Sequence, residues 1–173
     1  MKIARTVAAS ALGASVILGG VTMASPAQAA SSTQCHTTKK SFDLPYRADV
    51  DVKATICAKY TGTWGGYRHY QMWLHKISWD GAWWSNADMS LYFSVRGEHG
   101  SDWRSSGEVN NVTDEINGSS SGSKTFKTGG YGYGITYVTT KKRDWTADAY
   151  AVYNAHDGRG DRTWQLHGTA PVR

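Results

Sequence analysis

Residues 145–168 read WTADAYAVYNAHDGRGDRTWQLHG, and this stretch decides the fold class. Its first nine residues place an apolar side chain at every second position, which is the period of a strand with one buried face. Asn, Asp and Gly then cluster between residues 154 and 161, where Gly permits positive φ and Asn or Asp can bond its own backbone. Trp164 and Leu166 resume the alternation. We therefore predict a β-hairpin with a Trp near each open end, large enough to anchor it against a second sheet.

The same two-residue period recurs upstream of this hairpin. It runs through residues 49–60, 67–79 and 87–96, and a Gly-rich strand is expected at 131–140. After residue 29, no segment keeps a helical period over ten residues. These short strands with Gly-rich turns predict an all-β fold, an antiparallel β-sandwich of jelly-roll type, with a barrel as the alternative. Residues 97–123 are poor in large apolar groups, and we interpret them as loop with a short element near 109–116 and a mobile tip at 117–123.

The N-terminus has the three parts of an export signal. Lys2 and Arg5 supply the charged region, residues 8–21 the apolar stretch, and residues 27–29 the small-residue cleavage site. The apolar stretch falls short of the ~20 residues that span a membrane, so no membrane span is expected. We predict a signal peptide at 1–29, a flexible polar arm at 30–41 and one β-sandwich domain at 42–173. The protein is expected to be secreted and extracellular.

Two cysteines, Cys35 and Cys57, follow the signal peptide. In an oxidising compartment they are expected to form a structural disulfide. The bridge would close a loop of about 20 residues and stabilise the fold by roughly 3 kcal/mol in the chain-entropy model. Because Cys57 points away from the apolar face of its strand, the arm carrying Cys35 should cross the outside or the edge of the sheet.

The charge balance and the polar residues argue against several functions. The predicted signal carries two of the 19 basic residues and no acidic one, which leaves a modest and scattered positive charge and argues against nucleic acid as a partner. Only three Glu are present (Glu98, Glu108, Glu115), all in the presumed loop region, and no Gly-x-Ser-x-Gly motif occurs. The close trio Glu98, His99 and Asp102 has ligand types, but loop polarity explains it better. We therefore predict no catalytic residue, metal site or cofactor, and a small secreted hydrolase is the third hypothesis.

Aromatic residues are the most unusual feature of the composition, with eight Trp and ten Tyr. Trp73, Trp145 and Trp164 are expected in the core. Trp79, Trp83 and Trp84 flank a presumed turn at residues 80–81, and adjacent Trp residues cannot both point inward along a strand. Exposed Trp and Tyr anchor protein interfaces, and they also stack on pyranose rings. The binding residues predicted on this basis are Trp79, Trp83, Trp84, Tyr67 and Trp103.

The export signal, the early cysteine pair and three closing motifs together resemble a known group. The motifs are Trp145-Thr-Ala-Asp148, Asp157-Gly-Arg-Gly160 and Trp164-Gln-Leu166. They are similar to small secreted β-sandwich proteins of streptomycete-type bacteria and, within these, to the adaptor subunit of umbrella toxin particles. The resemblance implies a non-enzymatic adaptor in an extracellular antibacterial toxin complex. Its partners would be other secreted proteins, with residues 30–40 as a docking strand. A carbohydrate-binding module acting on cell-surface glycan is the alternative.

Overall fold

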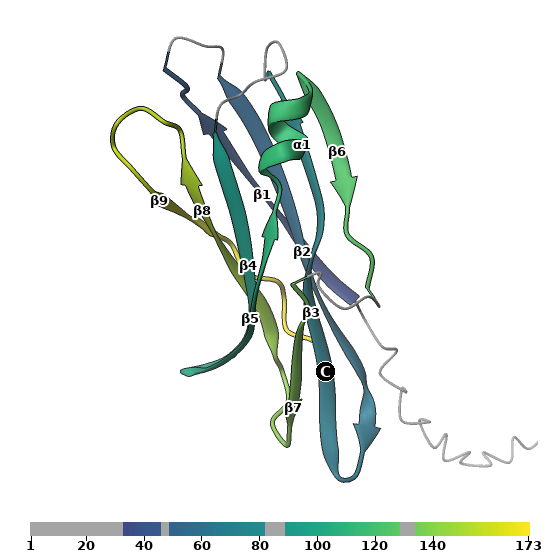
Figure 1. The fold of residues 1–173 in the computed structure, drawn as a ribbon. Coiled ribbons are helices and arrows are strands. Elements are labelled where there is room, and N and C mark those ends of the chain that lie inside the picture. Colours follow the sequence, from purple (N-terminus) through teal and green to yellow (C-terminus); the bar gives the residue numbers. More distant parts are fainter. Residues whose placement is uncertain (1–32, 46–48, 82–88, 129–133) are drawn as a thin grey trace, which may run out of the picture.

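The structure is a computed structural model that describes residues 33–45, 49–81, 89–128 and 134–173. Two antiparallel sheets pack face to face, and neither closes into a barrel (Figure 1). This confirms the predicted antiparallel β-sandwich and removes the barrel alternative.

Sheet A has strand order β1-β2-β3, and two further strands pair with successive parts of β3. Its members are β1 (Thr33–Phe42), β2 (Val50–Trp64), β3 (Tyr67–Asp80), β6 (Ser121–Thr125) and β7 (Thr136–Thr140). Sheet B has the order β5-β4-β8-β9. Its members are β5 (Asp102–Asn111), β4 (Ser90–His99), β8 (Thr146–Asn154) and β9 (Arg162–Leu166). A short helix, α1 (Thr113–Gly118), links β5 to β6. It lies at the end of the sandwich opposite the β2–β3 turn (Figure 1).

The core lies between the two sheets and follows the two-residue period. Along β8, Ala147, Ala149, Ala151 and Tyr153 are buried, while the intervening side chains are half-exposed. Alanines on this strand leave room for large rings from its neighbours. Trp164 packs edge-on against Phe42 of the opposite sheet, with ring centroids 5.8 Å apart. The predicted β8–β9 hairpin is confirmed.

The N-terminal segment forms part of the sandwich. Residues 33–42 form β1, an edge strand paired with β2 along its whole length, so the expectation of an irregular arm at 30–41 is wrong over this part. Only Thr38 and Phe42 of β1 are buried, which explains why its sequence looks like a polar coil. The Cys35–Cys57 disulfide joins the two strands at directly opposed positions and is confirmed.

The segment interpreted as loop also contains regular structure. β4 continues to residue 99, and β5, α1 and β6 occupy most of residues 102–125, so the predicted loop and mobile tip are wrong. β5 is exposed on both faces for most of its length, and it therefore shows no apolar alternation. Its hydrogen-bonded pairing with β4 holds it in place. Among the described residues, no helix is long and apolar enough to cross a membrane.

Candidate functional site

The predicted binding residue Trp79 is a core residue. Its side chain is 7% exposed, and its indole N–H donates to the backbone carbonyl of Ser119 at 3.1 Å. The six-membered ring lies against Gly122 of β6, where a Cβ would come within 2.6 Å of it. The prediction that Trp79 is a surface binding residue is therefore wrong, because β6 was not anticipated and its Gly122 provides the space for the indole.

Two other predicted binding residues do reach the surface. Tyr67 is 44% exposed and Trp103 is 60% exposed. They lie on different sheets, Tyr67 at the start of β3 and Trp103 near the start of β5. Trp83 and Trp84 lie outside the described residues. The predicted residues therefore do not form one site, and each exposed aromatic must be considered with its own neighbours.

The outer face of sheet B forms a grid in which residues of adjacent strands stand opposite one another. Asn111, Tyr92 and Val152 form the first row across β5, β4 and β8. The next rows are Val109–Ser94–Tyr150, Ser105–Arg96–Asp148 and Trp103–Glu98–Thr146. Three large apolar side chains of this face are exposed: Tyr92 (36%), Val109 (53%) and Trp103 (60%). They lie on β4 and β5, and charged residues occupy the last two rows on β4 and β8.

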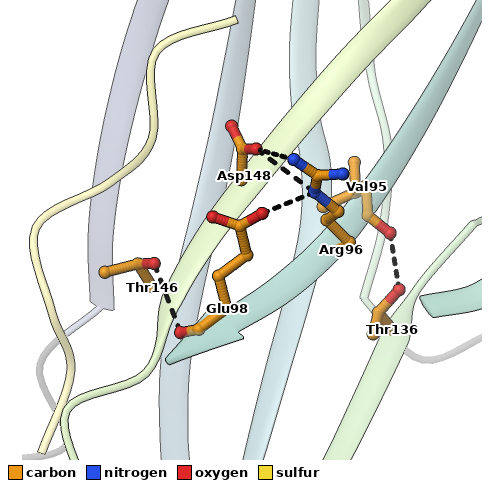
Figure 2. A network of polar contacts seen from close by, with 6 residues as sticks. All are labelled: Val95, Arg96, Glu98, Thr136, Thr146 and Asp148. Atoms are coloured by element: carbon orange, nitrogen blue, oxygen red, sulfur yellow. Dashed lines mark hydrogen bonds and ion pairs between the residues drawn. The ribbon is translucent and has the colours of Figure 1, made fainter. Parts of the chain in front are cut away.

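The charged group is a three-residue ion network on β4 and β8. Figure 2 shows the Arg96 guanidinium lying between the carboxylates of Glu98 and Asp148. Its Nε contacts Glu98 Oε1 at 2.7 Å, and its terminal nitrogen donates to Asp148 Oδ2 at 2.7 Å. Burial is the largest cause that raises the pKa of Glu98, and the neighbouring Asp148 carboxylate raises it further. The Arg96 guanidinium acts in the opposite direction and lowers it. One cation therefore binds both carboxylates.

Three aromatic rings are exposed at the β2–β3 turn. Trp64 is 56% exposed and stacks on His69, with ring centroids 3.4 Å apart and planes 4° from parallel. Tyr67 stands opposite Trp64 in the register, and the 60% exposed Tyr137 of β7 stands opposite Gln71. These side chains share the outer face of sheet A. We call the group Trp64, Tyr67, His69, Gln71 and Tyr137 the hairpin platform.

A cleft of about 390 Å³ lies where the ends of β1 and β8 meet. Three of the charged residues that line it, Lys40, Arg162 and Asp157, already interact with other residues of the protein. Lys40 lies over the Tyr153 ring at 5.4 Å, and Arg162 lies over the same ring at 5.0 Å while it pairs with Asp157 at 2.8 Å. Backbone and cationic neighbours, first the N–H of Arg159, lower the pKa of Asp157. We assign this cleft a structural role.

Glu98, His99 and Asp102 lie close together at the ends of β4 and β5, but each interacts with a different partner. His99 stacks near Trp145 with ring centroids 5.9 Å apart, Asp102 pairs with Lys142, and Glu98 binds Arg96. Within the described part of the chain, no three His, Cys, Asp or Glu residues gather as a metal site would require.

No family model, curated protein or solved structure matches this chain. We therefore infer the function from the geometry of the outer faces of sheets A and B.

Sequence reasoning missed most residues of both faces. The alternation of residues 87–96 already placed Tyr92 and Arg96 on the polar side of a strand, so half of the sheet B face was visible in the pattern. Trp64 and Tyr137 were not singled out. Their one available signal is the Trp64–Gly65–Gly66–Tyr67 sequence, in which two glycines between aromatic residues indicate a tight hairpin with rings on one face.

Proposed function

We propose that this chain is a secreted, non-catalytic binding protein whose partners are other secreted proteins. The outer face of sheet B is the proposed recognition surface. The observation that carries the proposal is the exposure of Trp103, Tyr92 and Val109 on the same face as an ion network in which Arg96 binds both carboxylates. Trp, Tyr and Arg are the residues enriched at protein interfaces and at their hot spots.

The aliphatic part of this face favours a protein partner over a sugar. Val109 is 53% exposed in the row next to Tyr92. A Val side chain has no ring face for a pyranose, and its burial is favourable only against another apolar surface. An exposed apolar group of this kind, rimmed by Ser94, Ser105 and Asn111, is typical of a protein interaction site.

The proposed cellular setting comes from the sequence. The predicted signal peptide and the Cys35–Cys57 disulfide agree with an oxidising, extracellular compartment. The resemblance to the adaptor subunit of umbrella toxin particles suggests an extracellular antibacterial complex. Residues 33–40 of the segment suggested as a docking strand belong to β1 and include Cys35 of the disulfide. Deleting them would disrupt the fold, so a deletion cannot test whether they bind a partner.

The test uses the purified chain as bait in culture medium of the organism that exports it. We expect a complex of defined stoichiometry by size-exclusion chromatography with light scattering. Trp103→Ala and Val109→Glu should each weaken the isolated complex at least tenfold. Tyr137→Ala is the matched control, because Tyr137 and Trp103 are equally exposed at 60% on opposite sheets. Recovery of the bait alone, or equal weakening by all three substitutions, would contradict the proposal.

A further inference from the structure

The hairpin platform is built as a flat aromatic surface that the fold itself does not need. The β2–β3 turn lies at the end of the sandwich opposite α1 (Figure 1). Trp64 and Tyr67 flank this turn. Trp64, Tyr67 and Tyr137 keep 44% to 60% of their surface exposed. Isolated exposed aromatics are ordinary, but here three exposed rings lie on one face of three neighbouring strands, β2, β3 and β7.

The position of Trp64 depends on a glycine. Gly62 stands opposite His69 in the β2–β3 register, with φ of 140°. A Cβ at this position would lie 3.2 Å from the Trp64 ring. Because Gly62 has no side chain, the indole can lean over it and stack on His69. The Thr139 hydroxyl shares a 3.1 Å hydrogen bond with His69 Nδ1 and fixes the imidazole. The backbone and the neighbouring strand therefore both hold the stacked pair.

The platform has the dimensions and groups of a sugar-binding surface. The five residues from Tyr67 to Gln71 extend ~14 Å along β3, the length of a short oligosaccharide. Tyr67 at one end and Tyr137 at the other can stack on pyranose rings. The Gln71 amide, directly opposite Tyr137, can both donate and accept hydrogen bonds. Unlike the outer face of sheet B, the platform exposes no aliphatic side chain.

The charge around the platform indicates which class of sugar it would bind. Lys141 Nζ lies 5.4 Å from the Tyr67 ring, and Lys59 stands opposite Gln71. A cleft of about 390 Å³ at this end of the sandwich is lined by Arg68, Arg143, Arg173 and Asp144. Arg173 and Asp144 form an ion pair at 2.9 Å, so Arg68 and Arg143 are the cations in excess there. None of the platform residues carries a carboxylate. An anionic ligand is therefore favoured over a neutral one.

From these observations we propose that the hairpin platform binds acidic oligosaccharides, glycans whose sugar units carry carboxylates. Trp64, Tyr67 and Tyr137 stack on the sugar rings, and Lys59 and Lys141 pair with the carboxylates. This function is independent of protein binding by sheet B, because the two surfaces lie on opposite sheets. Aromatic rings with nearby cations also suit single-stranded nucleic acid, but the predicted export of the chain favours a glycan.

The test measures quenching of Trp fluorescence by uronate tetrasaccharides from pectin, alginate and hyaluronan. We expect saturable binding of at least one, weakened at least tenfold by Trp64→Ala or Tyr137→Ala and several-fold by Lys59→Gln combined with Lys141→Gln. Trp103→Ala is the control and should bind as the unsubstituted protein does. Isothermal calorimetry repeats the titration without relying on Trp64 as the reporter.

Three results would overturn the proposal. The first is no binding of any uronate tetrasaccharide at millimolar concentration. The second is equal affinity for the neutral tetrasaccharide of cellulose, which would remove the charge argument. The third is tighter binding of a 15-nucleotide oligo-dT, which would make the platform a nucleic-acid surface. Failure of this proposal is distinguishable from failure of protein binding by sheet B. If both proposals hold, Tyr137→Ala weakens glycan binding and leaves capture of the protein partner unchanged.

Discussion

Replacing Arg96 by Met tests whether the ion network holds the outer face of sheet B together. The substitution keeps the length of the side chain and leaves the carboxylates of Glu98 and Asp148 without a cation. Arg96 is 34% exposed, Glu98 31% and Asp148 17%, so the network lies between a surface pair and a buried one. Exposed pairs contribute up to about 1 kcal/mol and broken buried pairs cost about 3–5 kcal/mol, so we expect a loss of about 1.5–3 kcal/mol at pH 7.

The assay is urea denaturation of the Arg96→Met protein at pH 7 and pH 3. In a thermal melt at pH 7, the same loss of unfolding free energy corresponds to a fall in Tm of roughly 4–10 °C. It should shrink at pH 3, below the ordinary pKa of carboxyl groups, because protonated carboxyls no longer repel each other. Arg104→Met is the matched control, since it removes the same charge from an exposed residue bonded to a backbone carbonyl. A loss equal to that of Arg104→Met, or one independent of pH, would refute the reasoning.

Three further predictions concern stability. Trp79→Ala should lower the free energy of unfolding by about 3–5 kcal/mol, because it empties a core site and leaves the Ser119 carbonyl without its donor. Replacing the exposed Trp103 by Ala should change it by no more than about 0.5 kcal/mol in the same urea titration. Replacing both Cys35 and Cys57 by Ser should lower the free energy of unfolding by about 3 kcal/mol, and the unsubstituted protein treated with dithiothreitol should be as unstable as this double variant. Equal stability of the oxidised protein and the double variant would contradict a stabilising role for the disulfide. Because the folded-state pKa of Glu98 is raised above its ordinary 4.5, its contribution to stability grows as pH falls through the raised value and levels off below 4.5. Glu98→Gln should therefore lose more stability than the unsubstituted protein between pH 7 and pH 4.5, and an unchanged pH profile would show that Glu98 does not titrate in this way.

The sequence predicted the parts of the fold whose strands bury one face. β8 buries Ala147, Ala149, Ala151 and Tyr153 at every second position, and its period of two could be recognised directly. β1 and β5 were missed for the same physical reason. An edge strand such as β1 buries only two of its ten side chains, and β5 is exposed on both sides, so backbone pairing holds them without an apolar pattern.

The candidate sites were harder to predict because exposure depends on strand pairing. Trp79 and Trp103 have similar polar neighbours in the sequence, yet one lies against Gly122 in the core and the other is on the surface. Arg96, Glu98 and Asp148 come from strands 50 residues apart, and only the β4–β8 register brings them together. The Cys35–Cys57 disulfide, by contrast, could be predicted from the number of cysteines and the predicted oxidising compartment alone.

Hydroxyl-radical footprinting of the protein bound to its captured partner tests the central claim most directly. The method reports the solvent exposure of individual aromatic side chains, and the two faces carry comparable reporters. Recognition by sheet B predicts that oxidation of Trp103 and Tyr92 falls several-fold on complex formation, while Tyr137 and Trp64 remain as reactive as in the free protein. Protection of Tyr137 and Trp64 with Trp103 and Tyr92 unchanged would contradict it.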